Sequence, residues 1–163
     1  MTDCVVAVGV ADVHHDPDPT SELVTQALMN VPAIANQTSG EWTHITLSDY
    51  EGWIRTRELE EPIAKAYCKV GEHCRTPLQL MAVVTATRTP LYTHTQGDAS
   101  SGNVYLSTAL PLLDITQQER VHVALPEERT AWLVRNAIDI REQQALYPCL
   151  LYTSDAADDL TRV

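Results

Sequence analysis

The sequence predicts an all-β protein built from two small barrels joined by a linker. Short apolar stretches alternate with polar residues at the two-residue period of a β-strand. Clusters of Pro, Gly, Asn, Asp and Ser interrupt these stretches at short intervals, as turns do in all-β domains. The order of strands and turns in the first half of the chain returns in the second half, as an internal repeat of roughly 60 residues. A repeat of this length fits one small barrel of about five short strands.

The first barrel is predicted over residues 4–60, and its first half contains three strands. A β-branched strand runs from Val5 to Val13, and a Pro- and Asp-rich loop follows from His14 to Glu22. The next apolar stretch, Leu23 to Ala35, contains Pro32. Because proline interrupts helices and the interior of sheets, this stretch is predicted to form two short strands that meet at the proline.

A hairpin is predicted to complete the first barrel. After the turn cluster NQTSGE, the segment WTHITL alternates cleanly, with Trp42, His44 and Thr46 on one face. The turn SDYEG follows, and the segment WIRTREL, which begins at Trp53, forms the last strand.

The second barrel is predicted over residues 81–142 and repeats this order. It contains a strand and a polar loop at 81–103, a proline-interrupted pair of strands at 104–115, an alternating strand at 120–125 and a closing strand at 132–140. Residues 61–80 between the two copies are predicted to be a linker.

Two pairs of residues mark the repeat most clearly. His44 corresponds to His122 within an alternating strand, and Trp53 corresponds to Trp132 at the start of the last long strand. Phenylalanine is absent from the chain, so large anchors for the cores are scarce. Both tryptophans are therefore expected to fill the barrels.

Composition excludes several classes of partner. The chain has 163 residues and a formal net charge of −11. An acidic chain repels the phosphates of nucleic acids and of anionic membrane surfaces, so neither is expected as a partner. No apolar run is long enough to cross a membrane, and the start of the chain lacks the basic region of a signal peptide. The cysteines outside the last fifteen residues are odd in number, which disfavours a disulfide framework and indicates a cytoplasmic location.

Two phrases in the first barrel and a longer stretch in the second resemble a known family. The phrases are TSELVTQAL and DYEGWI, and the stretch is NVYLSTALPLLDITQQERVHVALPEERTAWLVR. They resemble the tandem N-terminal bacterial SH3-type domains of NlpC-type cysteine peptidases. The group is that of the murein dipeptidyl-peptidase VI enzymes, which are γ-D-glutamyl-L-diamino acid endopeptidases. The resemblance extends from Val5 to about Pro148 and implies two SH3-like barrels.

In that family a papain-like catalytic domain follows the SH3-type region, with its nucleophile in an Asp-Cys-Ser-Gly segment. That segment does not occur in this sequence. The resemblance therefore implies the substrate-positioning region of a stem-peptide endopeptidase, without catalytic residues of its own and without a cofactor. The alternative is a stand-alone SH3-type module that binds cell-wall peptides or a protein partner.

The resemblance also implies two substrate-binding residues, Glu22 in TSELVTQAL and Tyr50 in DYEGWI. In the family, an acidic residue and a tyrosine of the first SH3-type domain hold the free amino group of the N-terminal L-alanine of a murein stem peptide. A carboxylate suits this role because it pairs with an ammonium group, and a phenol adds a hydrogen bond. The family more often has proline where this chain has Glu51, a second carboxylate that could compete for the amine.

Two clusters could in principle bind a metal. His14, His15, Asp16 and Asp18 form the motif HHDPD, which we expect to be a solvated loop. The linker motif CKVGEHC has the wrong spacing for a structural zinc site. We therefore expect no metal at either place.

The last residues, 143–163, are expected to be a linker stub and a non-native tail. CLLYTSDAADDLTRV, which begins at Cys149, resembles the translation of a sequencing-library adapter. The alternative is a divergent tail that the genome encodes. Sequencing of the genomic locus distinguishes the two.

Overall fold

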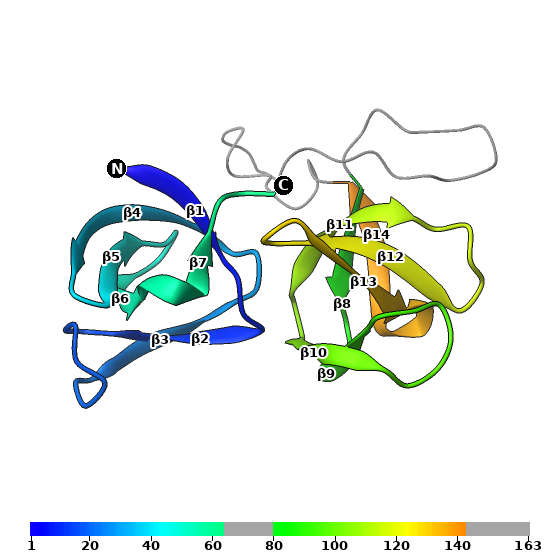
Figure 1. Cartoon of the computed structure of the whole chain (residues 1–163), viewed down its shortest axis with the longest axis horizontal. Coiled ribbons are helices and arrows are strands. Elements are labelled where there is room, and N and C mark those ends of the chain that lie inside the picture. The colour runs from blue at the N-terminus through cyan, green and yellow to red at the C-terminus, as the bar shows by residue number, and fades with distance from the viewer. Residues whose placement is uncertain (64–79, 143–163) are drawn as a thin grey trace, which may run out of the picture.

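The structure is a computed structural model that describes residues 1–63 and 80–142. Within these ranges the chain forms fourteen β-strands and two short 3-10 turns. The strands make two seven-stranded antiparallel sheets, one in each half of the chain (Figure 1). The prediction of an all-β chain with two small barrels in tandem is thus confirmed. Most of the predicted linker, including CKVGEHC, and the predicted tail lie outside the described residues.

The first barrel has the strand order β3-β2-β6-β5-β4-β1-β7. Its strands are β1 Thr2–Val6, β2 Val10–His14, β3 Leu23–Leu28, β4 Pro32–Ser39, β5 Trp42–Thr46, β6 Glu51–Arg55 and β7 Leu59–Glu60, with the 3-10 turn η1 Thr56–Glu58 before β7.

The second barrel repeats this topology in the order β10-β9-β13-β12-β11-β8-β14. Its strands are β8 Leu80–Val84, β9 Arg88–Tyr92, β10 Ser100–Tyr105, β11 Ala109–Asp114, β12 Arg120–Leu125, β13 Arg129–Val134 and β14 Ile138–Glu142, with the 3-10 turn η2 Arg135–Ala137 before β14. Equivalent strands therefore hold equivalent places in the two sheets, as the sequence repeat predicts.

Each barrel contains more and shorter strands than the sequence predicts. The single strand expected from Val5 to Val13 is divided into β1 and β2 by a bend at Val8 and Gly9. The backbone N–H of Ala7 still donates to the carbonyl of Glu58 at 2.8 Å, in register with the pairing of β1 and β7. Pro32 does lie at a strand start. Pro111, in contrast, lies inside β11, and the break falls earlier, at Ser107, whose φ is 79°.

The predicted role of two tryptophans is wrong. Trp53 and Trp132 are only partly buried, whereas their neighbours Ile54 and Leu133 have no exposed surface. Side chains alternate between the two faces of a strand, so the aliphatic residue fills the barrel and the tryptophan lies on the outer face. There Trp53 and Trp132 face His44 and His122 across the hairpin.

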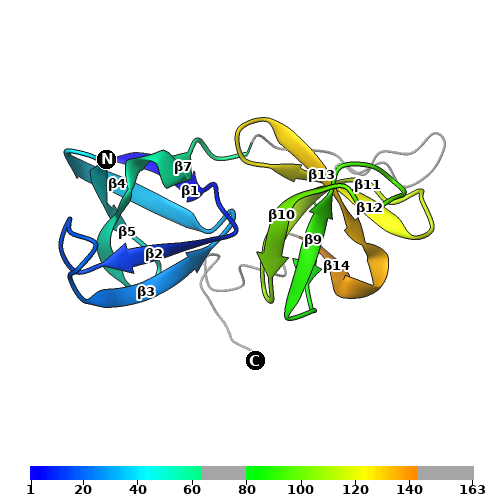
Figure 2. The same ribbon diagram turned by 60° about the horizontal axis from the view of Figure 1, so that its bottom comes forward.

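The structure assigns the two faces of the alternating strand β5, which the sequence divides without saying which one points inward. Thr43 and Ile45 are buried inside the first barrel, and His44 lies on the other face. The equivalent residues Val121 and Val123 are fully buried in the second barrel. Figure 2 shows the two barrels side by side, each with its own set of strands.

The core assignment predicts a contrast between two aliphatic positions of the first barrel. We expect Ile54→Ala to lower the free energy of unfolding by about 2–5 kcal/mol, because it leaves a cavity at a position with 0% exposure. Leu23→Ala, at a position that is 48% exposed, should change it by about 0.5 kcal/mol or less. Urea unfolding followed by circular dichroism measures both, and equal losses would contradict the assignment.

Candidate functional site

The two predicted substrate-binding residues lie at the starts of two strands of the first barrel. Glu22 directly precedes β3, and its carbonyl accepts the backbone N–H of His15 at 2.8 Å. Tyr50 directly precedes β6, and its carbonyl accepts the backbone N–H of Leu47 at 2.7 Å. These backbone contacts fix the main chain at both positions. Both residues are exposed to solvent, and the exposed fraction of Tyr50 is 52%.

The strand register brings Glu22 and Tyr50 to the same end of the sheet. Strand β2 lies between β3 and β6, and His14 pairs with Leu23 on one side and with Trp53 on the other. The two candidate residues therefore flank the end of β2. The close approach of β2 depends on Gly52, where a Cβ atom would lie 2.7 Å from the carbonyl oxygen of His14.

Neither candidate side chain is engaged. Among the described residues, no hydrogen bond or ion pair involves the carboxylate of Glu22 or the phenol of Tyr50, and none joins the two. This arrangement leaves an acceptor and a phenolic hydroxyl at one end of the sheet. It can accept an ammonium group from solvent without breaking an existing contact.

Glu51 differs from Glu22 because it already has a partner. Its carboxylate lies 3.7 Å from Nε2 of His44. Nδ1 of the same ring lies 3.0 Å from the side-chain amide nitrogen of Asn36, which also donates to the hydroxyl of Thr46 at 2.9 Å. The contact directs Glu51 toward the outer face of β5. Competition of Glu51 for an amine at Glu22 would require this contact to break.

The loop from His14 to Ser21 is held by its own hydrogen bonds. Nδ1 of His14 lies 3.1 Å from the carbonyl of Ser21, and Nδ1 of His15 lies 3.2 Å from the carboxylate of Asp16. Hydrogen bonds from the backbone N–H and the hydroxyl of Thr20 lower the pKa of Asp18. In the part of the chain that the structure describes, no three His, Cys, Asp or Glu side chains are grouped as metal ligands.

Cys4 is the one cysteine among the described residues, and its environment does not suit a nucleophile. The residue is 8% exposed, and its thiol donates a weak hydrogen bond to the carbonyl of Ala33 at 3.5 Å. Burial raises its pKa, and the charge of Asp3 acts in the same direction. A thiol with a raised pKa forms little thiolate at neutral pH.

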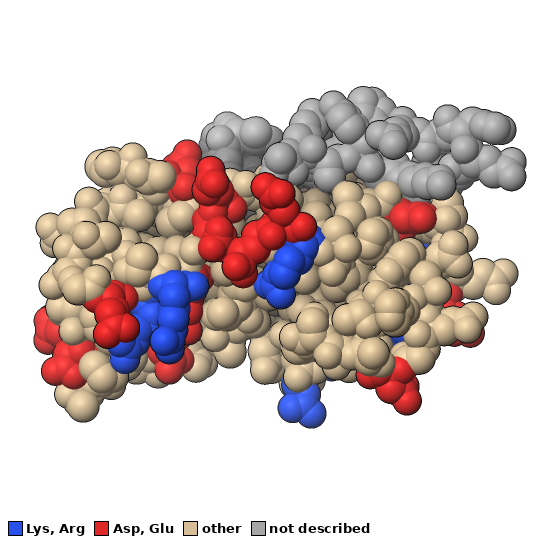
Figure 3. Space-filling model, in the orientation of Figure 1, with Lys and Arg blue, Asp and Glu red and all other residues tan. Residues whose placement is uncertain are grey.

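A cavity that sequence analysis missed lies between the barrels. It measures about 720 Å³ and is bordered by Glu60 and Glu61, at and directly after the end of β7, and by Glu127 and Glu128 in the β12–β13 turn. Figure 3 shows acidic side chains gathered in the middle of this face. Both pairs are visible in the sequence as adjacent glutamates, but only the packing of the two barrels brings them together.

The outer faces of the two barrels carry equivalent aromatic contacts. His44 meets Trp53 at 5.3 Å between ring centroids, and His122 stacks on Trp132 at 4.3 Å. Burial lowers the pKa of His122 below its ordinary value of 6.5, and the carboxylate of Asp114 partly opposes this. None of the helices in the described ranges has the length and apolar character that a membrane span requires.

Comparison with known proteins relates the chain through its fold. No protein-family model and no curated protein matches the sequence. An NlpC/P60 family protein from Bacillus cereus has a similar structure, with a TM-score of 0.69 at 18% identity over 88% of this chain. The match covers 57% of that protein, so this chain spans little more than half of its length. The likeness shows a shared fold.

Two more distant solved structures are NlpC2 and NlpC1 from Trichomonas vaginalis. They are 10% and 9% identical to this chain and cover 86% of it, with TM-scores of 0.33. The matches cover 48% and 46% of those proteins. At these scores neither structure bears on the fold of this chain.

The environment of His122 predicts a pH dependence of stability. Because its pKa is lower in the folded chain than in the unfolded one, the unfolded state binds more protons, and stability falls as the pH drops through 6.5 toward the folded pKa. We expect His122→Gln to reduce the loss of Tm between about pH 7 and 5. Asp114→Asn should enlarge it, because Asp114 raises the pKa of His122. Thermal melts across this range test both, and an unchanged slope in His122→Gln would contradict the assignment.

Proposed function

We propose that this chain is the SH3-type, substrate-positioning region of a cell-wall peptidase. The parent enzyme would be a cysteine endopeptidase that cleaves the bond between γ-D-glutamate and a diamino acid in murein stem peptides. The observation that carries the proposal is the fold shared with an NlpC/P60 family protein over 88% of this chain. The motifs TSELVTQAL and DYEGWI direct the proposal to this peptidase group.

In this proposal, Glu22 and Tyr50 form the subsite for the free amino group of the N-terminal L-alanine. The carboxylate of Glu22 pairs with the ammonium group, and the phenol of Tyr50 donates or accepts a further hydrogen bond. Their common position at one end of the sheet and their unengaged side chains support this assignment. A peptide extended or acylated at the amine would lose the ion pair and meet the two side chains, so the subsite would reject it.

The remaining parts of the proposal concern the whole enzyme. The nucleophile and its base would lie in a catalytic domain that completes the cleft opposite Glu22 and Tyr50, and this chain would not hydrolyse peptides by itself. A cytoplasmic location would suit the recycling of stem peptides that already carry a free N-terminus. The reaction would need no cofactor from this region.

The amine subsite predicts selective, weak binding. We expect L-Ala-γ-D-Glu to shift the backbone NMR resonances of residues 22 and 50, whereas its N-acetylated form should not, because acetylation removes the positive charge. Glu22→Gln should weaken binding of the free peptide by about tenfold, the cost of one charge-assisted hydrogen bond. Tyr50→Phe should weaken it less, because only the hydroxyl is lost.

Glu51→Gln serves as the matched control, since Glu51 is directed toward His44. Its affinity for the peptide should equal that of the unmodified chain. If Glu51→Gln abolished binding and Glu22→Gln retained it, the carboxylate that binds the amine would be that of Glu51, and the assignment to Glu22 would be wrong. Equal binding of the free and acetylated peptides would instead favour a general peptide-binding module, and hydrolysis of a stem tripeptide by this chain would contradict its role as a non-catalytic region.

A further inference from the structure

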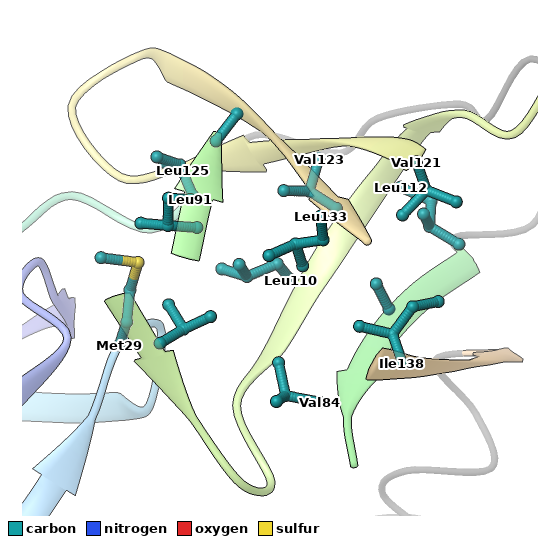
Figure 4. Close-up of a cluster of buried hydrophobic side chains, with 13 residues drawn as sticks. Met29, Val84, Leu91, Leu110, Leu112, Val121, Val123, Leu125, Leu133 and Ile138 are labelled. Carbon is teal, nitrogen blue, oxygen red and sulfur yellow. The ribbon is translucent and has the colours of Figure 1, made fainter. Parts of the chain in front are cut away.

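Met29 belongs to the first barrel in sequence but to the second barrel in packing. It lies in the turn between β3 and β4, is 4% exposed, and joins the buried cluster that fills the second barrel. In Figure 4 its side chain points toward Leu91 of the second barrel. The core cluster of the first barrel, in contrast, consists only of residues of that barrel. The core of the second barrel therefore includes a residue of the first barrel, whereas the core of the first barrel includes none of the second.

Two further contacts fix this turn against the second barrel. The side-chain amide of Asn30 donates a hydrogen bond to the carbonyl of Ala109 at 2.9 Å. Asn30 has a φ of 68°, a left-handed conformation that asparagine tolerates better than most residues. Gly9 lies directly against the second barrel, where a Cβ atom would be 2.5 Å from the carbonyl oxygen of Asn103. Any side chain at position 9 would push the barrels apart.

The internal repeat supplies a natural comparison, because the same turn occurs in the second barrel. Equivalent backbone hydrogen bonds define it. They are Met29 N–H to Gly9 O and Leu106 N–H to Thr87 O, both at 3.2 Å, and Asn30 N–H to Val6 O and Ser107 N–H to Val84 O, at 2.8 and 2.9 Å.

These equivalences pair Met29 with Leu106 and Gly9 with Thr87. Leu106 is 53% exposed, whereas Met29 is buried. Thr87 carries a side chain at the position where the first barrel has glycine. The turn itself therefore tolerates both an exposed apolar residue and a side chain at the glycine position. Burial of Met29 and the absence of a side chain at Gly9 are consequences of docking between the barrels.

We propose that the turn from Leu28 to Val31 is a plug that completes the core of the second barrel and couples the two barrels into one cooperative unit. The second barrel receives an apolar side chain that its own sequence does not provide. The plug also anchors the far end of β3, an edge strand that pairs only with β2 among the described residues. The coupling holds whether or not Glu22, at the near end of β3, binds an amine.

Hydrogen exchange on the full chain tests the plug. We expect Met29→Ala to lower the protection of backbone amides in β10 and β11 by more than about tenfold, because it opens a cavity in the second core. Met29→Leu should retain most of the protection, since it keeps the buried volume. Leu106→Ala, at the equivalent but exposed position, is the matched control and should leave protection within about twofold of the unmodified chain.

A side chain added at the interface between the barrels provides a second test, which removes no apolar surface. Gly9→Ala should lower the protection of the second barrel and separate a single thermal transition into two, whereas Thr87→Ala should do neither. The plug is overturned if Met29→Ala alters exchange no more than Leu106→Ala does, or if it alters exchange only in the first barrel. It is also overturned if Gly9→Ala leaves a single transition at the original temperature.

Discussion

The architecture depends on the alternation of side chains between the two faces of the central hairpin in each barrel. One residue of each pair, such as Ile54 or Leu133, is enclosed by the sheet, and its neighbour lies outside. Each barrel is so small that a shift of one residue would exchange its core for its surface. Histidine and tryptophan occupy matching positions on the outer face of both copies, because the interior is filled by other residues.

The sequence was sufficient to predict the class of fold, the repeat and the alternation of the strands, because these follow from local periodicity. It was misleading about the tryptophans, since size alone suggested a core role, whereas the narrow interior favours Ile54 and Leu133. The division of the first predicted strand was also missed. The break is a bend at Val8 and Gly9, and the carbonyl of Gly9 accepts the backbone N–H of Met29, a residue remote in the sequence.

The geometry of the candidate site also depends on contacts between segments that are far apart in the sequence. The motifs placed Glu22 and Tyr50 in separate segments, and the sequence alone could not relate them in space. The pairing of β2 with both β3 and β6 relates them, and Gly52 permits that pairing. The sequence also left the role of Glu51 open, because its contact with His44 depends on the hairpin register. Two carboxylates near the same end of a sheet can thus differ in whether they already have a partner.

The difference between Gly9 and Thr87 makes the two copies of the repeat unequal. One copy presents a bare backbone and a buried methionine where the other has a threonine side chain and an exposed leucine. The two barrels are therefore not interchangeable. A chain with its barrels in reversed order would lack a matching pair of surfaces at the junction.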